Sequence, residues 1–221
     1  MHIGILSDVH GNKPALDAVL TDMPPVDQLV CAGDLVGYNP WPNECTQWAR
    51  EQDIPTVSGN HDRAAVTETG FRFNGAARAG IEYTREVLDH QSIAWLRSLP
   101  ARERVDVGTV VIVHGHPDDP DRYTFPHEFS ERLLETVDGS VLVMGHTHKQ
   151  AAEQFSSGIV MNPGSVGQPR DGDPRAAYAV VDTEALSVEL CRVEYDIDRV
   201  AAAIRDVGLP ESLADRLYEG R

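Results

Sequence analysis

Residues 141–148 read VLVMGHTH, a run of four apolar residues followed by a glycine and two alternating histidines. A short apolar run with no polar interruption is typical of a buried strand. One histidine at its end could be a core residue with a satisfied hydrogen bond. Residues two apart in an extended segment project to the same side, so His146 and His148 are expected to face one site together. The pair indicates a ligand-binding role.

Four earlier apolar runs also end in polar loops that contain glycine. They are HIGIL (2–6), QLVCA (28–32), IPTV (54–57) and TVVIV (109–113). Helical patterns lie between the early runs, at 13–21 and 43–52, and Asn12 and Pro14 provide an N-cap and a first-turn proline for the first of them. This alternation of strand and helix favours parallel strands covered by helices.

The later part of the chain has a different pattern. Residues 151–156, 176–182 and 187–193 have little helix between them and predict antiparallel strands. The remaining segments are predicted to be mainly helical at 71–99, an exposed loop at 117–130, and one or two helices at 196–218. We therefore expect an α/β fold, a four-layer α/β/β/α sandwich of two mixed β-sheets flanked by helices. It is expected to form a single domain over residues 1–221.

Composition limits the partners and the location of this protein. The 221 residues carry a net charge of −16, and the two lysines are Lys13 and Lys149. No basic stripe is present to displace counterions, so long nucleic acid is not expected as a partner. No apolar run reaches the ~20 residues of a membrane span, and the N-terminus lacks the pattern of a signal peptide, so we expect no membrane association and a cytoplasmic location.

The acidic, lysine-poor surface has two readings. It can reflect adaptation to a salt-rich cytosol, because molar salt screens the repulsion between like charges. It can also be an ordinary acidic composition. The three cysteines are scattered without paired spacing, which favours reduced thiols.

The candidate functional residues fall at the ends of the apolar runs. Loops at the carboxyl ends of strands in open α/β sheets meet at one edge. Taken alone, each residue could have an ordinary structural role, such as a helix cap for Asn60 or a turn for Asp34. Candidate ligands at the ends of five apolar runs together indicate a metal site. Mixed carboxylate, amide and imidazole ligands suit Mn²⁺, Fe²⁺, Co²⁺, Ni²⁺ or Zn²⁺. The candidates are Asp8, His10, Asp34, Asn60, His61, His114, His146 and His148.

The same segments resemble a known family. SDVHGN (7–12), GDLVGY (33–38), GNHD (59–62), HGH (114–116) and GHTH (145–148) are similar to the motifs of calcineurin-like metallophosphoesterases. The small bacterial and archaeal phosphodiesterase branch is the most similar, and the stretches 37–45 and 162–178 also resemble it. The resemblance implies the metallo-dependent phosphatase-like fold and two divalent metal ions, with Mn²⁺ favoured.

The resemblance also implies a role for each motif residue. One metal would be held by Asp8, His10 and His148. The other would be held by Asn60, His114 and His146, with Asp34 bridging both. His61 would act as the general acid, and Asp62 would orient it. His116 departs from the usual pattern, and it either contacts phosphate or has no part in the site.

The expected reaction is hydrolysis of a small phosphodiester or phosphomonoester by a hydroxide that bridges the two metals, with His61 protonating the leaving group. The alternatives are a dinucleotide polyphosphate hydrolase and a protein Ser/Thr phosphatase, although residues 33–38 lack the arginines typical of the latter. A non-enzymatic alternative is a metal-binding scaffold, as in the similar retromer subunit. Arg170 and Arg175 could contact phosphate, but pairing with Asp171 or Asp173 is favoured. The sequence does not indicate the oligomeric state.

Overall fold

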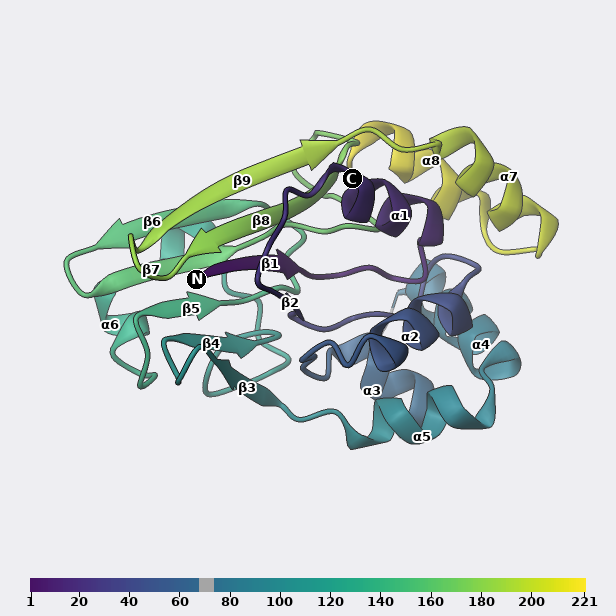
Figure 1. Ribbon diagram of the computed structural model, residues 1–221. Helices are drawn as coiled ribbons and strands as arrows, with labels where there is room; N and C mark the ends of the chain where they lie inside the picture. The colour runs from purple at the N-terminus through teal and green to yellow at the C-terminus, as the bar shows by residue number, and fades with distance from the viewer. Residues whose placement is uncertain (68–73) are drawn as a thin grey trace.

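The structure is a computed structural model that describes residues 1–67 and 74–221 (Figure 1). The elements in chain order are β1 (His2–Leu6), α1 (Lys13–Asp22), β2 (Gln28–Cys31), α2 (Pro42–Glu51), α3 (Asn60–Val66), α4 (Gly75–Val87), α5 (His90–Ser98), β3 (Arg102–Val105), β4 (Val110–Val113), η1 (Pro126–Glu128), α6 (Glu131–Leu134), β5 (Val141–Val143), β6 (Ala151–Phe155), β7 (Gly158–Asn162), β8 (Ala176–Asp182), β9 (Ser187–Val193), α7 (Ile197–Asp206) and α8 (Glu211–Glu219).

The strands form two sheets, and both are mixed. The first has the order β2-β1-β8-β9, with β1 parallel to β2 and antiparallel to β8. The second has the order β3-β4-β5-β7-β6, in which β4, β5 and β7 are parallel and the edge strands β3 and β6 are antiparallel to their neighbours. The predicted pair of mixed sheets is confirmed.

Side-chain alternation along the strands builds the layers. Ile3 and Ile5 of β1 face the second sheet and pack with Ile112 of β4 in the core between the sheets. Leu6, on the opposite face of β1, packs among residues of α1, α2 and α5. Val111 and Val113 of β4 face the other way, toward the short α6. Successive residues of a strand point to opposite faces, so apolar strands covered on both faces produce the predicted order of helix, sheet, sheet and helix.

The C-terminal helices occupy a separate position. α7 and α8 pack against each other, and their buried residues form one cluster with Tyr38 and Ala77. Tyr38 lies in the loop after β2, and Ala77 lies in the first turn of α4. In Figure 1 the two helices lie at the same end of the molecule as α4, away from the strand ends marked by β6 and β7. The helical pair therefore borders the loop that follows β2 and the start of α4.

Several sequence predictions differ from the structure in detail. The run IPTV (54–57) is not a strand, and Thr56 forms only an isolated bridge with Cys31. Its Pro55 lacks the N–H group that a continuing ladder would use. β3 and β7 were not predicted. The helical prediction for 71–99 is confirmed by α4 and α5, except for residues 71–73, which lie outside the described residues.

The expected N-cap of the first helix is present in the structure. α1 begins after Asn12, whose side-chain oxygen accepts a hydrogen bond from the N–H of Ala15 at 3.1 Å. All three cysteines are free. Within 1–67 and 74–221, none of the helices has the length and apolar character needed to cross a membrane.

Candidate metal centre

The candidate ligands lie on loops with an unusual backbone conformation. Within the described residues, ten non-glycine residues have positive φ, and five of them are candidate ligands: Asp8, His10, Asp34, His146 and His148. This left-handed conformation costs roughly 1–2 kcal/mol per residue. Such strain persists where the surrounding structure enforces it, and it gathers at functional sites. The segment 146–148 is therefore not extended, so the argument from strand alternation was wrong, although both rings do reach the site.

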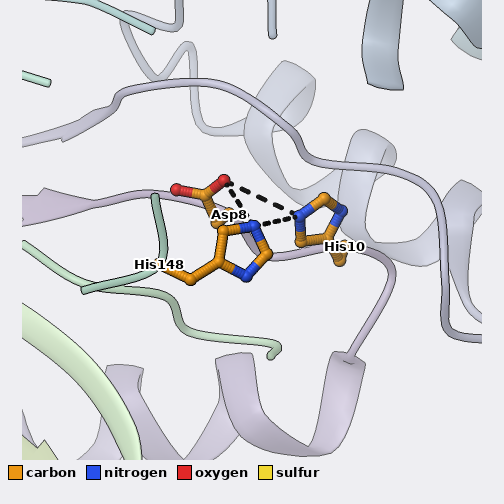
Figure 2. A group of neighbouring side chains, drawn as sticks. All are labelled: Asp8, His10 and His148. Atoms are coloured by element: carbon orange, nitrogen blue, oxygen red, sulfur yellow. Dashed lines mark hydrogen bonds and ion pairs between the residues drawn. The ribbon is translucent and has the colours of Figure 1, made fainter. Parts of the chain in front are cut away.

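The first group of ligands consists of Asp8, His10 and His148 (Figure 2). Asp8 Oδ1 lies 3.1 Å from His148 Nε2 and 3.6 Å from His10 Nε2. The two Nε2 atoms are 3.0 Å apart. All three side chains are buried.

The hydrogen bonds at the far side of each ring fix which nitrogen faces the group. His10 Nδ1 donates to the carbonyl of Val36 at 3.0 Å, and His148 Nδ1 donates to the carbonyl of Gln168 at 2.6 Å. Burial, with Arg170 as the next contribution, lowers the pKa of His148 to about 3, so its ring is neutral. Its Nε2 then carries a lone pair toward the group, as in metal-binding histidines whose other nitrogen donates to a carbonyl.

Asp8 supplies an independent test of whether this group fits a cation. Its Oδ2 accepts hydrogen bonds from Ser7 Oγ at 2.6 Å and from the N–H of His146 at 3.0 Å. Its Oδ1 is buried and accepts no hydrogen bond from any described residue. A buried carboxylate oxygen that faces imidazole lone pairs is costly unless a cation lies among them. The donor set therefore fits a divalent metal.

The second group consists of Asp34, His114 and His146. His114 Nδ1 donates to the carbonyl of Ala32 at 2.8 Å, and its Nε2 lies 3.3 Å from Asp34 Oδ2. Asn60 Oδ1 lies 3.2 Å from the same Nε2. His146 has the reverse arrangement: its Nε2 pairs with the carbonyl of Asp121 at 3.2 Å, which leaves Nδ1 for a ligand.

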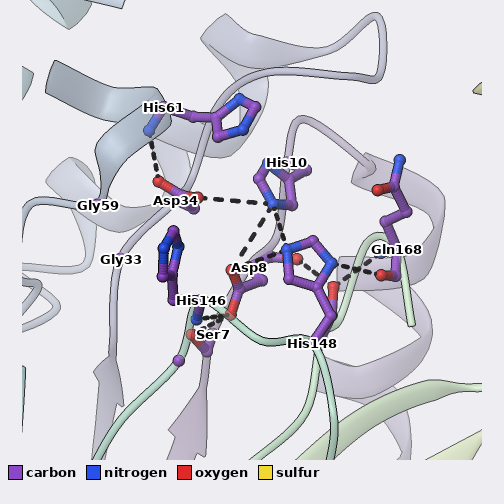
Figure 3. A network of polar contacts seen from close by, with 12 residues as sticks. Ser7, Asp8, His10, Gly33, Asp34, Gly59, His61, His146, His148 and Gln168 are labelled. Atoms are coloured by element: carbon purple, nitrogen blue, oxygen red, sulfur yellow. Dashed lines mark hydrogen bonds and ion pairs between the residues drawn. The ribbon is translucent and has the colours of Figure 1, made fainter. Parts of the chain in front are cut away.

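Asp34 lies between the two groups. Its Oδ2 is 3.7 Å from His10 Nε2 in the first group and 3.3 Å from His114 Nε2 in the second, while its Oδ1 accepts the N–H of His61 at 2.8 Å. Burial opposes ionisation of both partners, but Asp34 raises the pKa of His114 to about 9, and His114 in turn lowers the pKa of Asp34. Figure 3 shows this carboxylate between the rings of the two groups.

His61 and Asp62 follow Asn60 in the first turn of α3. The His61 ring lies 4.7 Å from the ring of His10 and 4.5 Å from that of Tyr38, measured between centroids. Burial lowers the pKa of His61. The carboxylate of Asp62 accepts the N–H groups of Asp34 at 2.8 Å, Gly59 at 3.0 Å and Val36 at 3.3 Å, so it joins the loop after β2 to the start of α3. Burial and Asp34 raise the pKa of Asp62 to about 6.

A pocket of about 210 Å³ opens onto both groups. Its lining contains Arg170, which donates to Gln168 Oε1 at 2.8 Å and to the Tyr38 hydroxyl at 3.1 Å. Arg170 therefore does not use Asp171 or Asp173. Asp171 pairs with Arg192 instead, and Asp173 pairs with Arg175 at 2.7 Å.

His116 lies elsewhere. It lines a second hollow with Asp118 and Arg122, and its Nδ1 accepts the N–H of Asp118 at 3.1 Å.

Sequence reasoning missed four side chains around the site. Tyr38 packs edge-on against the His10 ring, with centroids 4.6 Å apart, and the exposed Tyr123 stacks on the His146 ring at 3.9 Å. Gln168 is buried beside His148, and Arg216 of α8 reaches the pocket from the C-terminal helices. Tyr38 belongs to the GDLVGY segment and could have been considered. The position of Arg216 depends on how α8 packs, and no local pattern shows it.

Comparison with known proteins agrees with this geometry. Residues 1–186 match the model of the calcineurin-like phosphoesterase superfamily domain. The chain belongs to this superfamily. Its predicted fold and its assignment to a family of hydrolytic enzymes are thereby confirmed.

Individual relatives cover most of the chain. It is 32% identical over 241 residues to the uncharacterized protein MJ0912 of Methanocaldococcus jannaschii, covering 99% of this chain and 98% of that protein. It is 29% identical to the phosphodiesterase YfcE of Escherichia coli, with 85% and 91% covered. The crystal structure of a metallophosphoesterase from Sphaerobacter thermophilus is 38% identical, with a TM-score of 0.87 and coverage of 100% and 99%.

Proposed function

We propose that this protein is a phosphoesterase with two divalent metal ions that hydrolyses a small phosphodiester or phosphomonoester. Asp8, His10 and His148 would hold one metal, and Asn60, His114 and His146 the other. The position of Asp34 Oδ2, within 3.7 Å of His10 Nε2 and 3.3 Å of His114 Nε2, supports a bridging role and is the observation on which the proposal chiefly depends. Nitrogen and oxygen donors without thiolates favour a borderline metal such as Mn²⁺.

When bound, such metals supply a water that ionises near neutral pH and offset charge on the phosphoryl oxygens. The protein's own contribution begins with His61, whose ring lies at the edge of the site beside His10 and Tyr38. We assign it the role of general acid toward the leaving oxygen. Its lowered pKa leaves it neutral in the free protein, and an anionic phosphoryl group nearby would raise that pKa and allow protonation.

Asp62 would position His61 through the backbone. Its carboxylate holds the N–H groups of Gly59 and Asp34, which flank His61 in space, so it fixes the start of α3 relative to the Asp34 loop. Ser7 acts similarly on the first group, because its hydroxyl donates to Asp8 Oδ2 and leaves Oδ1 for the metal. In this proposal the chain's own residues hold the metal ligands in position and deliver one proton.

A small substrate is favoured by the pocket and by the charge. The volume of about 210 Å³ lies below the ~300–1,000 Å³ of sites for drug-sized ligands. The net charge of −16 disfavours long polyanions.

The proposal is tested by measuring metal content and hydrolysis together. Protein loaded with Mn²⁺ should contain two ions per chain and hydrolyse bis(p-nitrophenyl) phosphate, p-nitrophenyl phosphate or both. The Asp34→Asn variant should lose metal and activity together, whereas Arg199→Met, an exposed change on α7, should retain both. A folded protein that binds two metals and hydrolyses neither ester would contradict the enzymatic proposal and favour a scaffold.

A further inference from the structure

Two arginines line the pocket without a carboxylate partner. Arg170 lies in the loop between β7 and β8, and Arg216 lies in α8. Among the residues that the structure describes, neither guanidinium group forms an ion pair with Asp or Glu. Nearby Arg175 and Arg192 do form such pairs, with Asp173 and Asp171. In a chain with net charge −16, two unpaired cations that face one pocket are unexpected.

The two guanidinium groups share one neutral oxygen. Oε1 of the buried Gln168 accepts from Arg170 Nη2 at 2.8 Å and from Arg216 Nη1 at 3.2 Å. Arg216 Nε is buried and has no hydrogen-bond partner among the described residues. Burial and the neighbouring Arg170 lower the pKa of Arg216, so each cation is unfavourable for the other. An anion between them would remove this cost and satisfy the free donors.

The pair lies beside the metal centre, and Tyr38 contacts both. The Arg170 guanidinium lies 5.5 Å from the centroid of the Tyr38 ring, which also lies 4.5 Å from the ring of His61 and 4.6 Å from that of His10. Asn74, at the N-terminus of α4, lines the same pocket, and its side chain caps the N–H of Ala77. The N-terminus of a helix favours negative charge. The positive side of the pocket therefore extends from Arg170, beside the candidate ligands, to Arg216 of α8, an element that carries none of them.

We propose that Arg170 and Arg216 form an anion subsite for a second phosphoryl group of the substrate, beyond the phosphate that is cleaved. This inference rests on the proposed function, because it takes the scissile phosphate to lie at the two metals. Arginine is suited to the task, since its planar fork can bind two phosphate oxygens at once. Arg216 lies outside residues 1–186, which match the family model, so α7 and α8 add this specificity to the common site.

Binding is tested without metal and without turnover. Protein treated with EDTA is titrated with inorganic pyrophosphate by calorimetry, as the native sequence and as Arg170→Met, Arg216→Met and the control Arg199→Met. Methionine keeps the apolar part of the arginine side chain. If Arg216→Met fails to fold, Arg216→Lys replaces it, because lysine keeps the charge but lacks the planar fork. The two methionine variants should bind at least roughly tenfold more weakly than the control, because charged hydrogen bonds are lost. Absent binding to the native protein, or equal affinity in all variants, would overturn the subsite.

A kinetic comparison distinguishes the second phosphate from the scissile one. The probes are the p-nitrophenyl ester of thymidine 5′-phosphate and the same ester with an added 3′-phosphate. Arg216→Met should lower kcat/KM for the 3′-phosphorylated probe at least roughly tenfold more than for the other. Equal losses on both probes would place the arginines on the scissile phosphate and overturn the inference. If neither these probes nor the two p-nitrophenyl esters of the earlier test are hydrolysed, but pyrophosphate binding still needs both arginines, the proposed function fails and the pair remains an anion-binding site without a role in hydrolysis.

Discussion

Replacing Gly59 with alanine should displace Asp34 and disrupt the metal centre. A Cβ atom on Gly59 would lie 1.9 Å from Asp34 Oδ1 and 2.4 Å from the Asp34 nitrogen. Gly59 has φ −81°, which any residue adopts, so the predicted effect is steric and not a matter of backbone conformation. The carboxylate cannot simply turn away, because the N–H of His61 holds Oδ1 at 2.8 Å.

The size of the effect follows from this contact. An ordinary contact begins at 3.4 Å, so Asp34 and Gly59 must separate by about 1.5 Å. Binding sites tolerate only ~0.5 Å of displacement, and ~1 Å can cost ~100-fold in rate. We therefore expect kcat/KM to fall by at least ~100-fold. Overpacking that lowers the free energy of unfolding by about 1–3 kcal/mol would lower Tm by about 2–12 °C for a chain of this size.

The assay combines metal analysis with hydrolysis of bis(p-nitrophenyl) phosphate. Gly75→Ala is the matched control, because within residues 1–67 and 74–221 no atom beyond its chain neighbours and its own helix lies within 4 Å of the added Cβ, and the residue begins α4. The control should keep two metals per chain, and Gly59→Ala should bind one or none. A Gly59→Ala protein with both metals and normal turnover would show that the position of Asp34 is not critical.

Three further predictions concern the acid, the second metal and the surface. His61→Asn should lower kcat far more for a poor leaving group than for p-nitrophenolate while metal content stays constant, and equal losses would remove its role as the acid. Tyr123→Ala removes the ring that stacks on His146, with centroids 3.9 Å apart. A metal titration should then show one metal bound roughly 2–10-fold more weakly and the affinity for the other metal unchanged. If both affinities are unchanged, the stacking does not position His146. With a net charge of −16, Tm should rise by several degrees between low salt and 1 M KCl, where the screening length falls to about 3 Å; a flat or falling Tm would reject salt adaptation.

The sheets were predictable where the strands are apolar on both faces. Runs such as residues 109–113 and 141–144 must be covered on both sides, and this fixes a layered fold. β3, with the sequence RERV, was missed because its charged residues lie at an edge and show no apolar run. The run IPTV (54–57) was wrongly predicted to be a strand because it is apolar. Its apolar residues are buried, but they do not form a β-ladder.

Most of the candidate ligands were predictable because they follow apolar runs that form strands. Parallel neighbours bring their carboxyl ends to one edge of a sheet, so Asp8 and Asp34 after β1 and β2 were expected close together, as was His114 after β4 with the residues after β5. The left-handed backbone angles of Asp8, His10, Asp34, His146 and His148 could not be foreseen, and the expectation that His146 and His148 face one site was based on an extended conformation that the segment does not have. Arg216 could not be predicted, because only the packing of α8 against Tyr38 brings it to the pocket.

The presence of two metals is tested most directly by anomalous diffraction at the manganese edge from crystals grown with Mn²⁺. We expect two peaks about 3.5–4 Å apart, one beside Asp8, His10 and His148 and the other beside Asn60, His114 and His146, with the Asp34 carboxylate in contact with both. A single peak, or peaks remote from Asp34, would contradict this expectation.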